Sequence, residues 1–275
     1  MLNKYNKLEF LNEYDNVFEV FDKNDSGNIS FGVQKGLEKF FVKYAGYKTS
    51  NYSGDINSAI NVLKNAKNNY SVLKCETLVK MINTFETSQG FGIVFEWFNG
   101  ENLFPHWTFD EIDRYSDPRS PYYKFRQLDL KYKYQVIDKI FEFLIFVNNS
   151  GYIAVDFYDG SLMYNFESHC LKICDIDLFK STKHIINLEG ESYWGSSRIK
   201  SPEENKVGSI IDVRSNVYNL GKIIQCLVGN EFNPNLEDWE LSKQKYLIVE
   251  KSLNENPNKR YDSVEEFHYF WKNSN

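Results

Sequence analysis

Apolar and polar positions alternate along the first part of the chain with the period of β-strands. Residues 17–21 form one alternating run, residues 29–34 form a second, and a third ends in Phe40-Phe41-Val42-Lys43. A polar loop at residues 22–28 separates the first two runs, and Lys35-Gly36 separates the second from the third. Runs of this length joined by polar turns predict an antiparallel meander of three strands.

The next segment changes to helical spacing. Within residues 54–68, apolar residues from Ile56 to Leu63 recur every three or four positions, which predicts an amphipathic helix. Two further apolar runs, residues 77–85 and 90–98, predict a pair of strands after this helix.

Beyond the strand pair the pattern becomes irregular and then helical. Residues 102–127 contain several Pro and Tyr and predict a connector. Residues 128–148 carry an apolar helical face and predict a long helix that ends at Asn149-Ser150-Gly151. A final helix is predicted after Asp262-Ser263, because a Ser or Asp N-cap there precedes acids in the first turn. Its aromatic residues are expected to pack the helix against the rest of the protein, namely Phe267, Phe270 and Trp271.

Residues 151–177, here called the acidic hairpin, place acids beside two apolar strands. Asp156 and Asp159 accompany the first strand, and Asp175 and Asp177 follow the second. Phosphoryl transfer asks a protein for a carboxylate that orients the attacking hydroxyl and for oxygen ligands that hold Mg²⁺. The segment suits that chemistry, although an ordinary hairpin whose turns carry Asp explains it equally well at this point.

Three later stretches favour the first interpretation. They are residues 194–204, which contain Ser201-Pro202-Glu203, residues 216–221, which read Asn-Val-Tyr-Asn-Leu-Gly, and residues 256–260, which end in Arg260. With the acidic hairpin before them, they resemble the C-terminal lobe of protein kinases, in which an Ala-Pro-Glu motif, a helix start and a late Arg follow the catalytic loop in this order. The chain is similar to an atypical bacterial serine/threonine protein kinase-like protein.

The resemblance implies an α+β, bilobal protein-kinase-like fold in a single domain over residues 1–275. A small antiparallel, β-rich N-lobe would cover residues 1–98, and a larger, mainly helical C-lobe would cover residues 99–275. The implied activity is transfer of the γ-phosphoryl group of ATP to a hydroxyl, with Mg²⁺ as the metal and a protein as the expected acceptor. A protein acceptor is favoured because kinases of the aminoglycoside-phosphotransferase type usually lack the Ser-Pro-Glu and late-Arg elements.

The resemblance also assigns roles to individual residues. Asp156 would orient the acceptor hydroxyl, with Asp159 as the alternative base, and Lys43 would grip the α- and β-phosphates. Asp175 and Ser161 would hold Mg²⁺, and Asp177 would add a second carboxylate.

Nucleotide-binding roles fall mainly in the first hundred residues. Gly27 and Asn28, with neighbouring backbone N–H groups, would contact phosphate in place of a complete glycine-rich loop. The backbone of Glu96 to Phe98 would bind adenine, and Glu101 would reach a ribose hydroxyl. Residues 22–30 also follow the start of a calcium-binding EF-hand loop, but Val33 stands where the bidentate Glu belongs, so we interpret this loop as a phosphate-binding turn.

The sequence departs from the kinase pattern in the C-lobe. Val155 replaces the Arg that pairs with a phosphorylated activation loop, so we expect no switching by loop phosphorylation. Tyr158 replaces a common Lys, and Asn216 replaces a helix Asp that accepts hydrogen bonds from the catalytic loop. The resemblance nevertheless predicts a buried ion pair between Glu203 and Arg260.

In the N-lobe, the predicted helix over residues 54–68 contains no Glu to pair with Lys43. Asp55 and Asn57 are the only plausible substitutes. Two alternative functions therefore stay open: a catalytically weak pseudokinase that binds a nucleotide or a partner, and a small-molecule kinase of the aminoglycoside-phosphotransferase type.

Composition agrees with a globular, cytoplasmic protein. The chain has 275 residues, of which 42% are hydrophobic, enough to build a sizeable core. Its formal net charge of −6 disfavours nucleic acid as a partner, because phosphate neutralisation needs clustered Lys and Arg. No apolar run reaches the roughly 18–20 residues of a membrane span. Four dispersed Cys residues predict buried thiols rather than a metal site.

Overall fold

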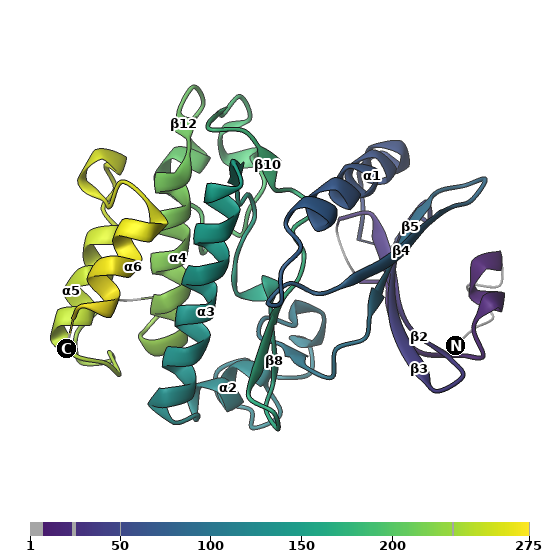
Figure 1. Cartoon of the computed structure of the whole chain (residues 1–275), viewed down its shortest axis with the longest axis horizontal. Coiled ribbons are helices and arrows are strands. Elements are labelled where there is room, and N and C mark those ends of the chain that lie inside the picture. Colours follow the sequence, from purple (N-terminus) through teal and green to yellow (C-terminus); the bar gives the residue numbers. More distant parts are fainter. Residues whose placement is uncertain (1–7, 24–25, 50, 233, 275) are drawn as a thin grey trace. The chain divides into compact units, whose positions relative to one another are not determined.

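The computed structural model describes residues 8–23, 26–49, 51–232 and 234–274, and it shows an α+β protein (Figure 1). An antiparallel sheet near the N-terminus is followed by a mainly helical region that contains small sheets. The chain divides after Asn99 into two compact units. This boundary lies one residue beyond the end of the predicted N-lobe.

The first unit is built on a five-stranded antiparallel sheet with the order β1-β2-β3-β5-β4. The predicted meander and the predicted strand pair are both confirmed, since β2 pairs with β1 and β3, and β5 pairs with β3 and β4. The strands span Asn16–Phe21 (β1), Asn28–Lys35 (β2), Glu38–Ala45 (β3), Met81–Glu86 (β4) and Phe91–Glu96 (β5).

Each face of this sheet is covered by a helical segment. A 3-10 helix, η2 (Glu9–Glu13), places Phe10 against Phe31 and Tyr44, with ring centroids 6.1 and 4.8 Å away. The predicted helix is α1 (Ile56–Val72), which places Tyr70 against Phe95 of β5 at 4.8 Å. Figure 1 shows η2, in purple near the N-terminus, and α1 on opposite sides of the sheet.

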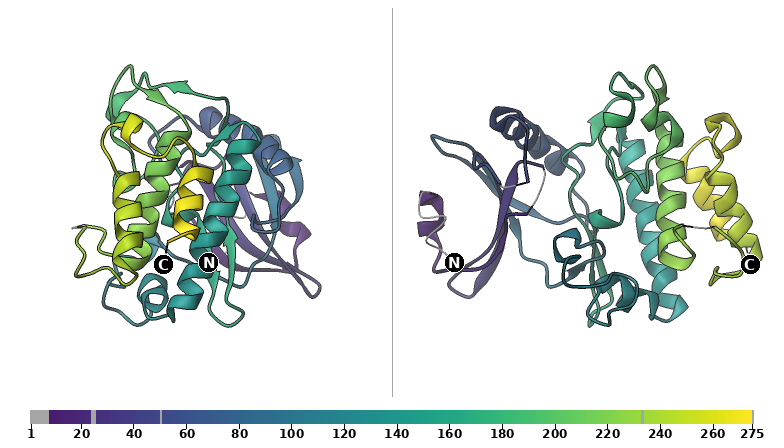
Figure 2. Two further views of the ribbon diagram at one scale, coloured as in Figure 1. Left: turned by 60° about the vertical axis from the view of Figure 1, so that its left-hand side comes forward. Right: turned by 180° about the vertical axis from the view of Figure 1, so that it is seen from behind.

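The second unit is centred on long helices that pack side by side (Figures 1 and 2). The predicted long helix is α3 (Leu130–Asn149), and it contacts both α4 (Val213–Val228) and α6 (Val264–Lys272). Phe141 of α3 packs at 4.9 Å from the Phe267 ring and 5.9 Å from the Trp271 ring. The remaining helices are α2 (Pro121–Arg126) and α5 (Lys243–Ser252).

The predicted final helix is confirmed with one difference in its packing. Ser263 caps α6 by accepting a hydrogen bond from the Glu266 N–H at 3.0 Å. Phe267 and Trp271 are buried as expected, whereas Phe270 is 42% exposed. Phe270 lies on the outer side of the helix, where it contacts the Tyr261 ring and the Lys251 ammonium group.

The second unit contains three small sheets, two of which include strands of the acidic hairpin. The order β6-β8-β9 joins Glu101–Asn102 (β6), Leu162–Asn165 (β8) and Cys170–Ile173 (β9). β7 (Tyr152–Ile153) pairs with β10 (Lys180–Ser181), and β11 (Ile185–Ile186) pairs with β12 (Ile210–Ile211). The first strand of the predicted hairpin is therefore split, because a turn at Asp156 and a 3-10 helix, η4 (Asp159–Ser161), separate β7 from β8.

Among the described residues, none of the helices combines the length and the hydrophobicity needed to cross a lipid bilayer.

Candidate functional site

Two of the predicted site acids adopt strained backbone conformations. Asp156 has φ 59° and Asp175 has φ 57°, in the left-handed region that non-glycine residues seldom enter. Within the described residues, the only other non-glycine residue with positive φ is His169, in the turn between β8 and β9. Such strain costs about 1–3 kcal/mol per residue and gathers at active sites, where the surroundings hold the residue in place. Two of these three residues are therefore acids to which the sequence analysis assigned a role.

The helix α4 braces the backbone just before Asp156. The Asn216 side chain accepts a hydrogen bond from the Ala154 N–H at 3.0 Å and donates one to the Ala154 carbonyl oxygen at 2.8 Å. The Asn148 side-chain amide donates a further bond to the Asn216 oxygen at 3.1 Å. Asn216, which stands where the kinase pattern has an Asp, thus still accepts a backbone hydrogen bond from this segment, and its amide adds a donor that a carboxylate would lack.

The hairpin between β8 and β9 brings Ser161 beside Asp175. The Cys174 N–H donates to the Ser161 carbonyl oxygen at 2.9 Å, which extends the register that pairs Leu162 with Ile173. The Ser161 hydroxyl is buried and has no hydrogen-bond partner in the part of the chain that the structure describes. A buried polar atom of this kind needs a partner, and a hydroxyl oxygen belongs to the oxygen ligands that Mg²⁺ prefers. Asp177, 8% exposed, lies two residues beyond Asp175.

Tyr158 lies close to both strained acids. Burial raises the pKa of its phenol far above the usual value, and the nearby carboxylates of Asp175 and Asp156 raise this pKa further. Tyr158 is therefore neutral at physiological pH and can only offer or accept a hydrogen bond. The position that often carries a Lys in kinases contributes no positive charge here.

Asp159 has very different surroundings from Asp156. Its side chain is 1% exposed and forms ion pairs with Arg114 and, at 2.6 Å, with Arg198. Each of the two carboxylate oxygens of Asp159 already accepts a hydrogen bond from a guanidinium group, so neither is open to an acceptor hydroxyl. These contacts favour Asp156 over Asp159 as the base.

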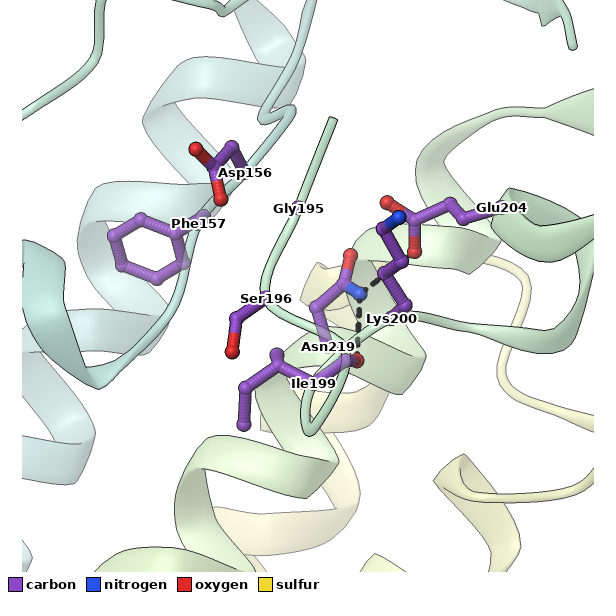
Figure 3. Close-up of a pocket in the computed structure, with 8 residues that line it drawn as sticks. All are labelled: Asp156, Phe157, Gly195, Ser196, Ile199, Lys200, Glu204 and Asn219. Carbon is purple, nitrogen blue, oxygen red and sulfur yellow. Dashed lines mark hydrogen bonds between the residues drawn. The ribbon is translucent and has the colours of Figure 1, made fainter. Parts of the chain in front are cut away.

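Asp156 also lines a small hollow together with Gly195, Ser196, Ile199 and Lys200 (Figure 3). The hollow measures about 10 Å³, room for about one water molecule, so it is too small for a substrate. Asn219 of α4 holds the far side of this segment by donating to the Ile199 carbonyl oxygen at 3.0 Å and to the Glu204 carboxylate at 2.9 Å.

The predicted ion pair between Glu203 and Arg260 is confirmed. The two guanidinium nitrogens of Arg260 contact the two carboxylate oxygens of Glu203 at 2.6 and 2.8 Å, and both side chains are buried. Burial alone would raise the pKa of Glu203, but hydrogen bonding and charge from Arg260 outweigh it and hold the pKa below its ordinary value. The Ser215 hydroxyl donates a further bond to Glu203 at 2.7 Å.

Lys43 lies in the first unit, on the face of the sheet that α1 covers. In the register of β3 it stands opposite Ser30 and Ile93. Alternate residues of a strand share a face, and Phe41 on this face packs at 6.3 Å from Phe95, which contacts α1.

Helix α1 contains no acid, in agreement with the sequence. Neither proposed substitute for the missing Glu is suitably placed. Asp55 caps the helix by accepting a hydrogen bond from the Ser58 N–H at 2.9 Å, and both Asp55 and Asn57 are exposed.

The proposed phosphate loop packs against the start of α1. Gly27 has φ +77°, and a Cβ atom there would lie 2.8 Å from both Ala59 and the Tyr52 ring, so only glycine fits. The Asn28 side chain is buried, and its amide contacts the Ser26 hydroxyl at 3.4 Å. Positions 24 and 25 of this loop lie outside the described residues. Strands flank the loop instead of the helices of an EF-hand.

Two of the backbone N–H groups proposed for adenine binding already form hydrogen bonds to neighbouring strands or their ends. The Glu96 N–H donates to the Lys80 carbonyl oxygen at 2.9 Å, and the Trp97 N–H donates to the Lys39 carbonyl oxygen at 3.3 Å. Phe98 is the next residue, and it follows the last sheet hydrogen bond of this segment. These contacts move the expected adenine donor from Glu96 and Trp97 to Phe98.

Glu101, the proposed ribose ligand, lies at the start of the second unit. Both of its carboxylate oxygens contact the Lys124 ammonium group, at 3.0 and 2.8 Å. A ribose hydroxyl would have to share Glu101 with this cation.

Sequence reasoning missed three charged residues that surround Asp159: Arg114, Arg198 and Glu231. Arg114 and Glu231 lie outside every motif and gave no signal. Arg198 lies inside the stretch that contains Ser201-Pro202-Glu203, so a charged residue at that position could have been singled out.

Neither the models of known protein families nor the sequences of curated proteins include a match to this chain. The functional argument therefore depends on the contacts described above.

Proposed function

We propose that this protein is an atypical protein-kinase-like phosphotransferase that transfers the γ-phosphoryl group of ATP to a hydroxyl group, with a protein as the acceptor. The observation that carries the proposal is the pair of strained acids, Asp156 and Asp175, in one braced hairpin. Two strained carboxylates near the same phenol are difficult to explain as an ordinary hairpin, because each strained residue reduces stability.

The chemistry assigned to this chain's residues is positioning and charge stabilisation. Asp156 would accept a hydrogen bond from the acceptor hydroxyl and hold it in line with the γ-phosphorus atom. Asp175, Ser161 and Asp177 supply the oxygen atoms that would hold Mg²⁺, which neutralises charge on the phosphates when bound. Lys43 is assigned to the phosphates.

A protein acceptor is favoured by the pair between Glu203 and Arg260. This bidentate pair and its hydrogen bond from Ser215 anchor the segment that follows residues 195–200, which line the hollow beside Asp156. A fixed segment beside the acceptor base suits an extended peptide chain more than a small molecule.

The proposal is tested by incubating the protein with γ-labelled ATP, Mg²⁺ and a mixture of protein acceptors. We expect labelled protein, and we expect chelation of Mg²⁺ or Asp175→Ala to abolish labelling. Asp110→Asn is the matched control, because Asp110 is an exposed acid of the same unit. Absence of transfer with every metal and acceptor, or full activity of Asp175→Ala, would contradict the proposal.

A second candidate is a nucleotide- or partner-binding module with little turnover. It is favoured by the absence of an acid within α1 and by the use of Asp55 as a helix cap, because the Glu that the kinase pattern places in this helix is missing. Thermal unfolding with and without Mg²⁺ and ATP separates the two functions when combined with the transfer assay. Binding raises the unfolding temperature by mass action, so stabilisation without transfer would support the second candidate.

A further inference from the structure

A buried cluster of four charges lies beside the catalytic loop. We call it the charge cluster, and it consists of Arg114, Asp159, Arg198 and Glu231. Arg114 contacts Asp159 and, at 3.5 Å, Glu231. Arg198 contacts Asp159 at 2.6 Å and Glu231 at 3.2 Å. Each cation thus pairs with both acids, and the cluster carries no net charge.

The charge cluster joins segments that are far apart in the sequence. Asp159 belongs to η4, three residues beyond Asp156, and Arg198 lies between Ser196 and Ile199, which line the hollow beside Asp156. Glu231 follows α4, and Arg114 comes from the connector before α2. The Phe104 ring packs under both guanidinium groups, at 4.4 Å from Arg114 and 4.0 Å from Arg198.

The cluster does not suit a metal ion, although Asp159, Cys226 and Glu231 place potential ligand atoms within 4.8 Å of one another. Burial, followed by the charges of Asp159 and Glu231, raises the pKa of the Cys226 thiol far above its usual range, so the thiolate that a metal needs is disfavoured. Both carboxylates are already neutralised by arginine.

We propose that Arg198 is a positioning residue whose ion pair with Asp159 holds residues 195–200 against the catalytic loop without any phosphorylation. Its effect on catalysis depends on the proposed function, whereas its effect on the order of the segment does not. Val155 offers no cation to a phosphorylated loop, and the ion pair with Asp159 is formed entirely by the protein's own side chains.

Charge balance supports this role. Ser196 and Ser197 lie next to Arg198, but a phosphate on either residue would find Arg198 already paired with Asp159 and Glu231. A phosphate would have to displace a buried carboxylate to gain that guanidinium group, and the displaced carboxylate would then lack a partner. The segment is therefore ordered by its own side chains and gains little from modification.

Hydrogen exchange tests the proposal independently of activity. The N–H groups of Ile199 and Lys200 donate to the Ser196 carbonyl oxygen at 2.9 and 3.0 Å, so their exchange reports on the order of the segment. In wild-type protein shown by mass to carry no phosphate, we expect both amides to be protected. Exchange at the rate of an unstructured peptide would overturn the proposal, and this test needs no variant to fold.

Variants of Arg198 then measure the contribution of the ion pair. Arg198→Ala is expected to speed exchange of the Ile199 and Lys200 amides at least tenfold. Arg198→Lys should give an intermediate rate, because Lys keeps the positive charge but cannot contact both acids in the way that a guanidinium group does. The matched control is Arg119→Ala, because Arg119 is exposed and forms its ion pair with nearby Asp117, away from the charge cluster. Unchanged exchange in Arg198→Ala would overturn the proposal.

Kinetics separates a positioning role from a general loss of stability. If the wild-type protein transfers phosphate, Arg198→Ala should lower kcat/KM for the protein acceptor at least tenfold and leave the KM for ATP within twofold. An equal change in the KM for ATP would overturn the positioning role. If the wild-type protein transfers no phosphate, the proposed function fails, and the exchange measurements still decide whether the ion pair orders the segment.

Discussion

Two aspartates three residues apart in the catalytic loop differ in every property that matters for catalysis. Asp156 is half-buried, has a strained backbone and borders the hollow formed with residues 195–200. Asp159 is almost fully buried and is fixed by Arg114 and Arg198. Under the proposed function the first would act on an acceptor hydroxyl, whereas the ion pairs of the second hold its segment together.

Asp159→Asn should therefore reduce stability more than a typical surface change. Removing the carboxylate charge leaves two buried guanidinium groups with one remaining acid, a change that usually costs about 3–5 kcal/mol. Denaturant unfolding measures the loss directly. The exposed control Asp110→Asn should change the free energy of unfolding by less than about 0.5 kcal/mol. A loss below about 1 kcal/mol for Asp159→Asn would contradict the assignment.

The pair between Glu203 and Arg260 gives stability a specific dependence on pH. Arg260 holds the pKa of Glu203 below its ordinary value of about 4.3. Because the folded-state pKa is the lower one, the carboxylate stabilises the protein above about pH 4.3, and this stabilisation is lost as the pH falls through the folded-state pKa.

The corresponding measurement compares wild type with Glu203→Gln at several pH values. We expect the difference in the free energy of unfolding to be largest near neutral pH and to shrink in acid. The neighbouring Glu204 has a pKa raised by burial, so its own contribution changes in the opposite direction. Taking the difference between the two proteins removes the part of that contribution that burial causes, and a difference that does not vary with pH would contradict the assignment.

At the scale of elements, α4 serves as the brace of the acidic hairpin. Asn216 satisfies both backbone polar groups of Ala154, and Asn219 of the same helix holds residues 195–200 through the Ile199 carbonyl oxygen. The turn that carries Asp156 and the segment beside it are thus fixed to one rigid helix. This arrangement explains how the left-handed conformation of Asp156 is maintained.

Asn216→Ala should destabilise the protein by at least about 1–3 kcal/mol, because it leaves buried backbone groups of Ala154 without hydrogen bonds. Thermal or denaturant unfolding provides the measurement. Asn65→Ala in α1 is a suitable control, since Asn65 is exposed on a helix. Equal stabilities of the two variants would show that the brace contributes little.

Most regular elements could be predicted because their signals are local. Periodicity predicted the meander, α1, α3 and α6, and the Ser263 cap marked the start of the last helix. The split of the first hairpin strand could not be predicted, because it depends on the left-handed Asp156, which is maintained by contacts with α4 about 60 residues away.

At the scale of the whole molecule, the predicted residues are distributed over two units. The first unit carries Gly27, Lys43 and the strand that ends at Glu96, and the second carries the acidic hairpin. The pair between Glu203 and Arg260 was predictable because a family resemblance links two distant motifs. The charge cluster was not predictable, since its four members are separated by long stretches and share no motif.

Local hydrogen bonds explain which site assignments the structure changes. Asp55 was a candidate partner for Lys43 because of its position in the sequence. Its carboxylate instead accepts a hydrogen bond in the first turn of α1. The Glu96 N–H was a candidate for adenine, but the sheet uses it. In both cases a backbone hydrogen bond, which sequence patterns describe poorly, determines the role of the residue.

The most direct test of the account is the initial rate of γ-phosphoryl transfer from labelled ATP to protein in the presence of Mg²⁺, compared between wild type and Asp156→Asn. The account predicts that the variant folds, binds ATP like wild type and transfers phosphate about 10²–10⁴ times more slowly, the usual contribution of a positioned acid or base. Transfer by Asp156→Asn within twofold of the wild-type rate would contradict the central role given to Asp156.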